Sequence, residues 1–320
     1  MKVSVATVTY NHEQFLEQSV ASALAQRTNF PFEIIIGEDC STDGTRAVAQ
    51  QLADRNPDRV RLFLQGKNVG LTRNTAQTFA RCTGEYIAIL EGDDYWLDQE
   101  KLQRQVDYLD ANPDCAWCFT RAIVVDERGG KLDVPPVVWH VQPKYTLAEY
   151  LDRKFQPRFC TVMFRRGLFA DYPEWYYEMP TADLPLHVLN TFPDKLIGFI
   201  DREMSAYRVH TGGVWSHGID PSKESDQSPE ARRRLAKRFG ESVALFEAVD
   251  AHLQGAHRDI LRRQIANHAE QWTDLNISVA DYPAARRSSV KALVGRLKCR
   301  EIPTRRLLRA FLQSWGRIGG

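Results

Sequence analysis

An acidic cluster that directly follows an apolar run is the part of the sequence best suited to chemistry. The segment LEGDDYW places Glu91, Asp93 and Asp94 at the end of the apolar run EYIAIL. Mg²⁺ and Mn²⁺ favour oxygen ligands, and Mg²⁺ usually takes one or two carboxylates together with substrate phosphates. The cluster could therefore hold a divalent cation against a diphosphate, whereas a solvated acidic turn is the alternative interpretation.

The residues that lead up to this cluster alternate between strand-like and helix-like patterns. Apolar, β-branched runs predict strands, and apolar spacings of three and four predict helices. The predicted strands are 2–9, 32–37, 60–64 and 85–90, and the predicted helices are 13–26, 42–55 and 71–81. This alternation predicts an α/β protein with a mostly parallel central sheet and helices on both faces. Ligands of such sheets bind beyond the carboxyl ends of the strands, where the polar motifs fall.

Polar residues end the first two predicted strands and should therefore meet at one edge of the sheet. The first strand ends in Thr9, Tyr10 and Asn11, and the second ends in Glu38 and Asp39. Asp39 could accept a hydrogen bond from a nucleobase N–H, and Tyr10 offers a ring face for stacking. This pair suits uracil and would also tolerate thymine, whereas guanine fits it less naturally.

Four segments together resemble the nucleotide-sugar-binding half of a family 2 glycosyltransferase. They are TYNHEQFLEQSVASALAQ, EDCSTDGT, NVGLTRNTA and LEGDDYW, in this order and spacing. The resemblance is close over residues 1–125 and looser beyond them. It implies a Rossmann-like nucleotide-diphosphate-sugar transferase fold of the A type, with an acceptor-binding half appended.

The resemblance also assigns residues to the donor. Asp39 would face the base edge, and Arg73 would lie near the base or the diphosphate on a turn shaped by Asn68. The residues assigned to the nucleotide sugar are Thr9, Tyr10, Asn11, Glu38, Asp39, Asn68, Arg73, Asp93 and Arg208. UDP-sugar is the favoured donor.

A metal cofactor, Mn²⁺ or Mg²⁺, is likewise implied by the resemblance. Asp94 would be its main ligand, with Asp93 and His210 as further ligands. Glu91 stands where the family more often has Asp, and it keeps the charge. His210 lies in YRVHTGG, which resembles the segment that closes the donor site, and Arg208 there could neutralise the departing diphosphate. A structural role is the alternative for this histidine.

Inverting transfer needs a base that can take the proton of the acceptor hydroxyl, and Asp183 is the candidate. It lies in PTADLPLHVL, where an ordinary helix N-cap is the alternative interpretation. A D-x-P-L segment at this distance matches the family pattern and favours the catalytic role. The resulting hypothesis is a metal-dependent inverting glycosyltransferase of polysaccharide biosynthesis that acts by single displacement. Its acceptor would be a hydroxyl of a glycan, a lipid-linked glycan or another glycoconjugate.

Two other functions are compatible with parts of this pattern. A non-catalytic nucleotide-sugar-binding protein would keep the donor site without a working base. A nucleotidyltransferase would share the fold and metal, but it normally has a Gly-rich, basic loop after the first strand, and TYNHEQF is not one.

The sequence divides into a catalytic domain and a helical C-terminal region. The predicted parts are a catalytic domain at 1–218 (donor half 1–125, acceptor half 126–218 with a flap at 212–215), a linker at 219–230 and a helical region at 231–320. Within the last region, helices are predicted at 239–253, 257–277, 284–297 and 304–315. This appendage is a natural place for a homodimer contact.

The last predicted helix sets apolar residues against arginines. The apolar side consists of Leu307, Leu308, Phe311, Leu312 and Trp315, and the basic side consists of Arg305, Arg306, Arg309 and Arg317. Such a helix is typical of a peripheral membrane contact, which would place the protein at the inner face of the membrane. The favoured alternative is that its apolar stripe docks on the appendage or on a second subunit.

Composition predicts a cytoplasmic enzyme. The chain has 320 residues with 43% hydrophobic content, and its net charge of +1 gives no pull toward nucleic acid. It has no apolar run of about 18 residues and begins with a strand pattern rather than a signal peptide. The six cysteines form no recognisable disulfide or metal framework and are expected to be free thiols.

Overall fold

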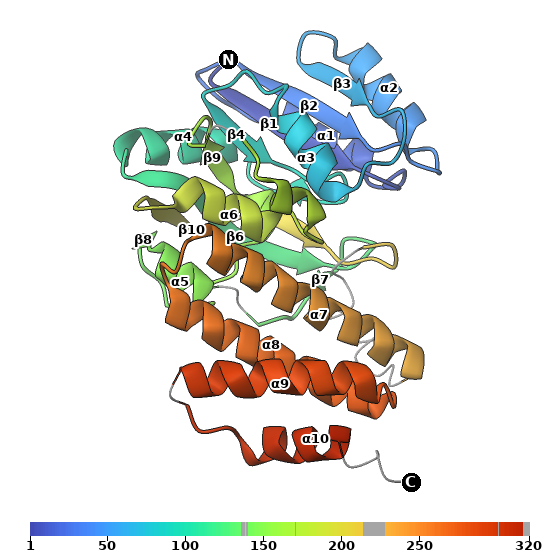
Figure 1. Ribbon diagram of the computed structural model, residues 1–320. Helices are drawn as coiled ribbons and strands as arrows, with labels where there is room; N and C mark the ends of the chain where they lie inside the picture. The colour runs from blue at the N-terminus through green and yellow to red at the C-terminus, as the bar shows by residue number, and fades with distance from the viewer. Residues whose placement is uncertain (136–137, 139, 170, 214–227, 300, 316–320) are drawn as a thin grey trace. The chain divides into compact units, whose positions relative to one another are not determined.

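The computed structural model describes residues 1–135, 138, 140–169, 171–213, 228–299 and 301–315 (Figure 1). The chain forms two compact units, Met1–Ile219 and Asp220–Gly320. The first unit contains the sheet and carries the candidate site. The second unit is helical in the part of it that is described.

One sheet forms the centre of the first unit. Its strands are β1 (Val3–Thr9), β2 (Phe32–Glu38), β3 (Val60–Leu64), β4 (Tyr86–Ile89), β5 (Tyr95–Trp96), β6 (Cys115–Val125), β7 (Lys131–Leu132), β8 (Lys144–Tyr145), β9 (Met163–Arg165) and β10 (Leu196–Arg208). They pair in the order β3-β2-β1-β4-β9-β6-β10-β5, with β7 beside β6 and β8 beside β10. β3, β2, β1 and β4 are parallel neighbours, and β6 is parallel to β10. The predicted α/β class with a mostly parallel central sheet is confirmed.

Helices pack on one face of this sheet, and their apolar residues form a core together with those of the strands. The helices of the first unit are α1 (Leu16–Leu24), α2 (Thr45–Arg55), α3 (Leu71–Phe79), α4 (Lys101–Ala111), α5 (Leu147–Leu151) and α6 (Asp183–Thr191), with 3-10 turns at Phe159–Thr161 and Glu174–Glu178. Every second residue of β1 and β2 joins α1, α2 and α4 in a single apolar cluster. It includes Val3, Val5, Ile34, Ile36, Leu16, Val20, Leu52 and Leu102.

The opposite face packs closely against α3. A Cβ on Gly37 of β2 would overlap the side chain of Thr78, so only glycine allows this approach. Asn74 of the same helix donates its side-chain N–H to the Gly37 carbonyl at 2.8 Å. Helices therefore cover both faces of the sheet, as predicted, and α3 is fixed where its N-terminal end meets the carboxyl ends of β1 and β2.

Two helices begin later than their sequence pattern predicts, because the preceding residues form turns. Before α1, the His12 carbonyl accepts the N–H groups of Phe15 and Leu16, so residues 13–15 belong to a turn. Before α2, the Asp43 carboxylate accepts the backbone N–H of Thr45 at 2.9 Å and satisfies a helix-start donor. Both turns lie at the edge where β1 and β2 end, so they place polar groups there.

The second unit contains α7 (Pro229–His252), α8 (Arg258–Ser278), α9 (Tyr282–Lys298) and α10 (Arg305–Trp315). Ser228 caps α7 by accepting the N–H of Ala231 at 3.1 Å. A core of Val243, Ala269, Ala292 and Leu307 joins all four helices. Within the described residues, no helix is both long enough and apolar enough to cross a membrane. The predicted linker falls largely on residues 219–227, which lie outside the described part of the chain.

Candidate active site

Three segments that are far apart in the sequence meet at the carboxyl end of the sheet. The turn after β1 carries His12, the loop after β4 carries the acidic cluster, and the end of β10 carries Arg208 and His210. β5 pairs with β10, and this pairing brings the end of β10 beside the acidic loop. A Cβ on Gly92 would lie 2.9 Å from His12 Nδ1, so the glycine allows the loop to approach the turn.

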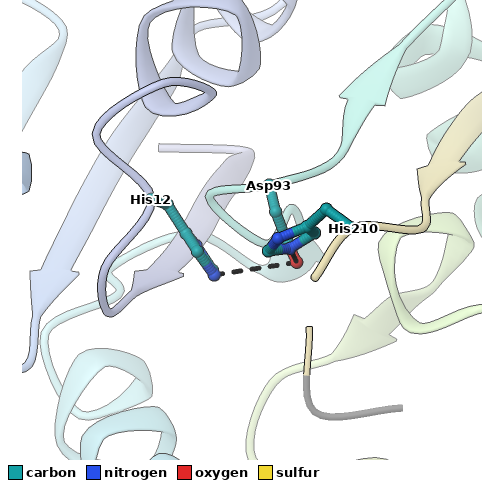
Figure 2. Close-up of side chains that lie close together, drawn as sticks. All are labelled: His12, Asp93 and His210. Atoms are coloured by element: carbon teal, nitrogen blue, oxygen red, sulfur yellow. Dashed lines mark hydrogen bonds and ion pairs between the residues drawn. The ribbon is translucent and has the colours of Figure 1, made fainter. Parts of the chain in front are cut away.

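Asp93 lies between two imidazoles (Figure 2). Its Oδ2 is 3.1 Å from His210 Nε2 and 3.6 Å from His12 Nε2. The three ligand atoms all lie within 4.8 Å of one another, which is close enough for one cation to contact them all. Phe15 packs on the His210 ring at 4.8 Å between centroids and supports its orientation. The structure thus brings together two of the predicted metal ligands and adds His12.

Asp94 is tied to the end of β10 rather than to this trio. Its Oδ1 accepts the backbone N–H of Arg208 at 2.8 Å, and the residue is 1% exposed. Its Oδ2 is buried and has no partner that meets hydrogen-bond geometry among the described residues, although the nearby Cys160 thiol interacts with this carboxylate and opposes the rise of its pKa that burial causes. Buried carboxylate oxygens are normally satisfied, so this oxygen is a candidate position for a ligand that the chain itself does not supply.

The side chain of Arg208 supports the acidic loop through several hydrogen bonds. Its guanidinium donates to the Asp93 carbonyl at 2.9 Å, the Glu127 carbonyl at 2.8 Å and Gln18 Oε1 at 2.5 Å. It also lies over the ring of Phe15 at 4.8 Å. Arg208 is 4% exposed. The resemblance assigns this group to the departing diphosphate; in the described structure it fixes the backbone that presents Asp93 and Asp94.

The carboxylates of this cluster shift one another's pKa values. Burial raises the pKa of Glu91 well above its usual range, and the charges of Asp94, Asp93 and Asp183 raise it further. Burial and the charge of Asp93 likewise raise the pKa of Asp94. Burial alone would also raise the pKa of Asp93, but the nearby imidazoles of His12 and His210 bring it below the ordinary value. The cluster therefore concentrates negative charge at Asp93, where a cation would reduce the repulsion.

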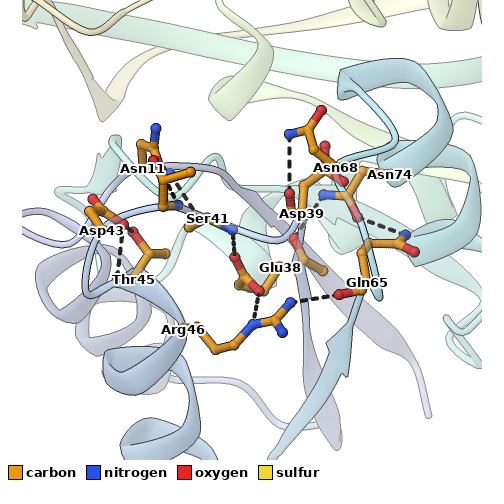
Figure 3. Close-up of polar contacts among 12 residues, drawn as sticks. Asn11, Glu38, Asp39, Ser41, Asp43, Thr45, Arg46, Gln65, Asn68 and Asn74 are labelled. Carbon is orange, nitrogen blue, oxygen red and sulfur yellow. Dashed lines mark hydrogen bonds and ion pairs between the residues drawn. The ribbon is translucent and has the colours of Figure 1, made fainter.

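The predicted base-binding residue Asp39 shapes the turn before α3 (Figure 3). Its two carboxylate oxygens accept the backbone N–H groups of Val69 at 2.8 Å and Gly70 at 2.9 Å. Asn68 donates its side-chain N–H to the Asp39 carbonyl at 3.1 Å. Gly70 has a positive φ of 87°, a conformation that favours glycine. Asp39 and Asn68 are thus neighbours, and each oxygen of Asp39 keeps one lone pair.

The other predicted donor residues of the first strands form a polar network around the loop after β2. Glu38 is buried, accepts the Ser41 N–H at 2.5 Å and forms an ion pair with Arg46 at 2.6 Å. Asn11 accepts the Thr42 N–H at 2.9 Å. This network fixes the loop that runs beside the β1 turn, as Figure 3 shows for Asn11, Ser41 and Glu38.

Three further predicted donor residues differ in exposure. Thr9 is buried, and its hydroxyl has no hydrogen-bond partner among the described residues, whereas Tyr10 is 40% exposed and keeps a free ring face. Arg73 lies over the ring of Tyr177 at 4.5 Å, within 3.9 Å of Glu174. Arg73 thereby connects α3 to the segment Glu174–Glu178 of the second half.

Asp183 is the first residue of α6, one position after the N-cap, so it is not itself the capping residue that the alternative interpretation predicts. The hydroxyl of Thr181 donates to its carboxylate, and the capping residue itself is Ala182, which makes no side-chain cap hydrogen bond. The charge of Asp183 also raises the pKa of Glu91, although by less than burial and the charges of Asp94 and Asp93 do. The carboxylate of the proposed base thus interacts electrostatically with Glu91 of the acidic loop.

His187 lies one turn along α6 and is completely buried. It stacks on Trp117 at 4.3 Å between ring centroids, and its Nδ1 is 2.6 Å from the hydroxyl of Tyr150. Burial lowers the pKa of His187 from 6.5 to about 4, against the opposing effect of Asp183. The imidazole is therefore neutral at physiological pH. It belongs to the buried packing of α6 one turn beyond Asp183.

This depressed pKa predicts a pH dependence of stability. The unfolded chain takes up the proton near pH 6.5 and the folded protein only near pH 4, so acid favours unfolding over that window. We expect the His187 contribution to fall by up to about 3 kcal/mol as pH falls from 6.5 to 4. Urea unfolding of wild type and His187→Gln between about pH 7 and pH 4.5 measures the free energy of unfolding at each pH. The same decrease of this free energy with falling pH in both proteins would contradict the prediction.

His12 is a site residue that we did not select from the sequence. It lies in the segment TYNHEQF, whose residues Thr9, Tyr10 and Asn11 are predicted donor residues, and it is 81 positions before Asp93. The signal available was a histidine directly after the first strand, at the edge where ligands bind. Of the predicted flap, Gly213 donates its N–H to the His210 carbonyl at 3.1 Å, and Trp215 lies outside the described residues.

The fold and site together define a nucleotide-sugar-dependent glycosyltransferase with the A-type fold. The chain belongs to Glycosyl transferase family 2, whose sequence model matches residues 4–172. The family resemblance and the enzyme class that we predicted from the sequence are thereby confirmed.

Relatives extend the likeness over most of the chain. An uncharacterised protein of Mycobacterium tuberculosis is 33% identical over 271 residues, which cover 84% of this chain and 73% of that protein. The poly(ribitol-phosphate) beta-N-acetylglucosaminyltransferase TarS of Staphylococcus aureus is 30% identical over 288 residues, covering 86% of this chain and 45% of TarS.

Solved structures share the fold at low sequence identity. TarS residues 1–349 in complex with UDP-GlcNAc match with a TM-score of 0.56 and 17% identity, covering 95% of this chain and 93% of that one. A mannosyltransferase from Pyrobaculum calidifontis in complex with GDP-Man and Mn²⁺ matches with a TM-score of 0.54 and 14% identity, covering 99% and 86%.

Proposed function

We propose that this glycosyltransferase is metal-dependent and inverting, and that it transfers the sugar of a UDP-sugar to a hydroxyl group of the acceptor in one displacement. The observation that carries the proposal is the Asp93 carboxylate between His12 and His210, beside the unsatisfied Oδ2 of Asp94. A buried acidic cluster with a partnerless oxygen fits a cation better than it fits a solvated turn.

The donor set favours Mn²⁺ over Mg²⁺. Mg²⁺ prefers oxygen ligands and keeps several waters, whereas Mn²⁺ accepts imidazole nitrogen more readily. In our proposal Asp93, His12 and His210 hold the ion, and the free oxygen of Asp94 completes the protein ligands directly or through water. The Mn²⁺ in the complex of the Pyrobaculum calidifontis mannosyltransferase supports this choice.

The proposed donor position follows from the exposed side chains of Tyr10 and Arg73 and from the buried carboxylate of Asp39. The nucleobase would stack on Tyr10 and contact the remaining lone pairs of Asp39, while Arg73 would approach the diphosphate from α3. Uracil is supported by the UDP-GlcNAc in the complex of the structurally similar TarS. The acceptor we propose is a glycan or lipid-linked polymer of the cell envelope, in line with the poly(ribitol-phosphate) substrate in the name of TarS. Such an enzyme would act at the cytoplasmic side, where sugar nucleotides are available.

In the proposed reaction the chain's own residues position the reactants and move one proton. Arg208 holds the Asp93 carbonyl through its guanidinium and the Asp94 carboxylate through its backbone N–H, so the acidic loop does not need to rearrange when the donor binds. Asp183 takes the proton of the acceptor hydroxyl as that oxygen attacks the anomeric carbon. A bound cation would supply positive charge for the departing diphosphate.

Calorimetric titration with UDP, dTDP, GDP and CDP, each with Mn²⁺, with Mg²⁺ or with EDTA, tests this proposal. We expect UDP to bind, and to bind about tenfold or more tightly with Mn²⁺ than with Mg²⁺. Equal affinity for all four nucleotides would remove Asp39 and Tyr10 from base selection. UDP affinity that is the same in EDTA would remove the metal from the donor site.

A further inference from the structure

Two neighbouring helices of the second unit expose apolar side chains that the fold leaves uncovered. α10 packs on α8 and α9 through the buried residues Leu307, Ala310 and Ser314. The adjoining side of α10 carries Leu308, Leu312 and Trp315, of which Leu312 is 66% exposed. The helix therefore docks on the appendage along one stripe and leaves a second apolar stripe free.

α9 contacts the same part of α10 through Arg286, which donates to the Ser314 carbonyl at 2.6 Å and lies 5.5 Å from the centre of the Trp315 ring. α9 also exposes apolar residues of its own. Its residues Val290, Val294 and Leu297 recur at spacings of four and three, and Leu297 is 64% exposed. Ile302, in the connection between the helices, is 91% exposed. We call the exposed side chains of α9, α10 and their connection the α9–α10 face; Figure 1 shows the two helices side by side.

The α9–α10 face is basic as well as apolar. α9 and α10 contain arginines and lysines and no Asp or Glu at any position. Arg287, Lys298, Arg305 and Arg309 are exposed, and no carboxylate of the described residues lies within ion-pair distance of them. The acidic residue of the connection, Glu301, is already paired with Arg296 at 2.6 Å.

We propose that the α9–α10 face docks on an anionic lipid bilayer, with its apolar side chains in the headgroup region and its free cations on the lipid phosphates. Exposed Leu, Ile and Trp beside unpaired Arg and Lys are the combination that interfacial helices use. The proposal goes beyond the glycosyl transfer reaction and does not depend on the assignment of any active-site residue.

Charge favours a bilayer over a second copy of the chain. In a twofold-symmetric dimer the same patch meets itself, so the unpaired cations of one α9–α10 face would oppose those of the other. Like charges held close together without counter-ions weaken such an interface. An anionic membrane instead supplies the missing negative charge, and it also removes the exposed apolar side chains from water.

Flotation of the full chain with lipid vesicles tests the proposal. We expect binding to vesicles that contain phosphatidylglycerol and little binding to pure phosphatidylcholine. Each basic residue at a membrane surface strengthens binding about fivefold, so Arg305→Glu with Arg309→Glu should weaken it by about 25-fold or more. Leu312→Glu should weaken binding as well, because it places a charge in the headgroup region.

Matched controls come from α7 of the same unit. Leu235 is 43% exposed, close to the exposure of Leu308, and the Lys237 side chain is 79% exposed. Leu235→Glu and Lys237→Glu should leave vesicle binding unchanged, and circular dichroism confirms that every variant is folded. Absence of binding to anionic vesicles would overturn the proposal, as would binding that neither α9–α10 variant weakens. Light scattering that finds a dimer disrupted by Leu312→Glu, without vesicle binding, would assign the face to a second copy.

Discussion

Asp93→Asn should abolish metal-dependent donor binding and leave the fold intact. The substitution keeps the size of the side chain but removes the charge that both imidazoles face at 3.1 and 3.6 Å. Because the low pKa of Asp93 results from those imidazoles, the native carboxylate is charged and available to a cation. We expect kcat/KM to fall by about 10²–10³-fold, typical for loss of one electrostatic group at a developing charge. Calorimetry with UDP and Mn²⁺ gives the binding part of this loss.

The control for this substitution is Asp107→Asn. Asp107 is exposed on α4 and accepts a hydrogen bond from Gln103 within the same helix, so its variant should bind UDP as wild type does. His12→Gln gives a second check, because it removes an imidazole that only the structure places in the site. An Asp93→Asn protein that keeps the wild-type response to Mn²⁺ would show that the cation, if one is used, binds elsewhere.

Local sequence patterns were sufficient to predict the first four strands and the acidic loop. β1, β2, β3 and β4 are short apolar runs, and their predicted bounds differ from the observed ones by at most one residue. LEGDDYW lies directly after β4, so its place at the carboxyl end of the sheet follows from the position of that strand alone. These patterns are local, because a strand that is buried on both faces of a sheet is itself a continuous apolar run in the sequence.

Long-range pairing explains what the sequence did not predict. β9 has three residues, too few to show a period, yet it lies between β4 and β6 and is antiparallel to both. The trio of His12, Asp93 and His210 depends on the pairing of β5 with β10, which has no local signal. The hydrogen bonds of the Arg208 guanidinium could not be predicted for the same reason, since its acceptors come from α1, the acidic loop and the turn after β6.

The last helix shows how two competing interpretations can each describe part of one element. Docking of its apolar stripe on the appendage was the favoured interpretation, and Leu307 and Ala310 do pack there. Leu308 and Leu312 lie on the adjoining side and stay exposed. Sequence periodicity measures the full apolar width of a helix, and it cannot tell how much of that width the neighbouring helices cover.

Asp183→Asn should preserve donor binding and remove most of the transfer. The amide keeps the oxygen that accepts the Thr181 hydroxyl, so the start of α6 should remain ordered above the buried His187. An amide has no basicity at neutral pH, so the acceptor hydroxyl would lose its proton acceptor. We expect kcat to fall by about 10²–10⁴-fold with an unchanged Kd for UDP. Release of UDP from the sugar nucleotide, measured with an acceptor that supports wild-type turnover, gives the rate.

Measuring the Kd for UDP and kcat separately distinguishes a catalytic base from a residue that only stabilises the start of α6. If Asp183 only stabilised the start of α6, its amide would lower the free energy of unfolding and leave kcat nearly unchanged, because a folded fraction would still turn over normally. Urea unfolding of the same variant measures that effect directly. A near-normal kcat would make Glu91 the next candidate for the base. Burial raises the pKa of Glu91, and the charge of Asp183 raises it further. Glu91→Gln would then have to show the loss of rate that Asp183→Asn did not.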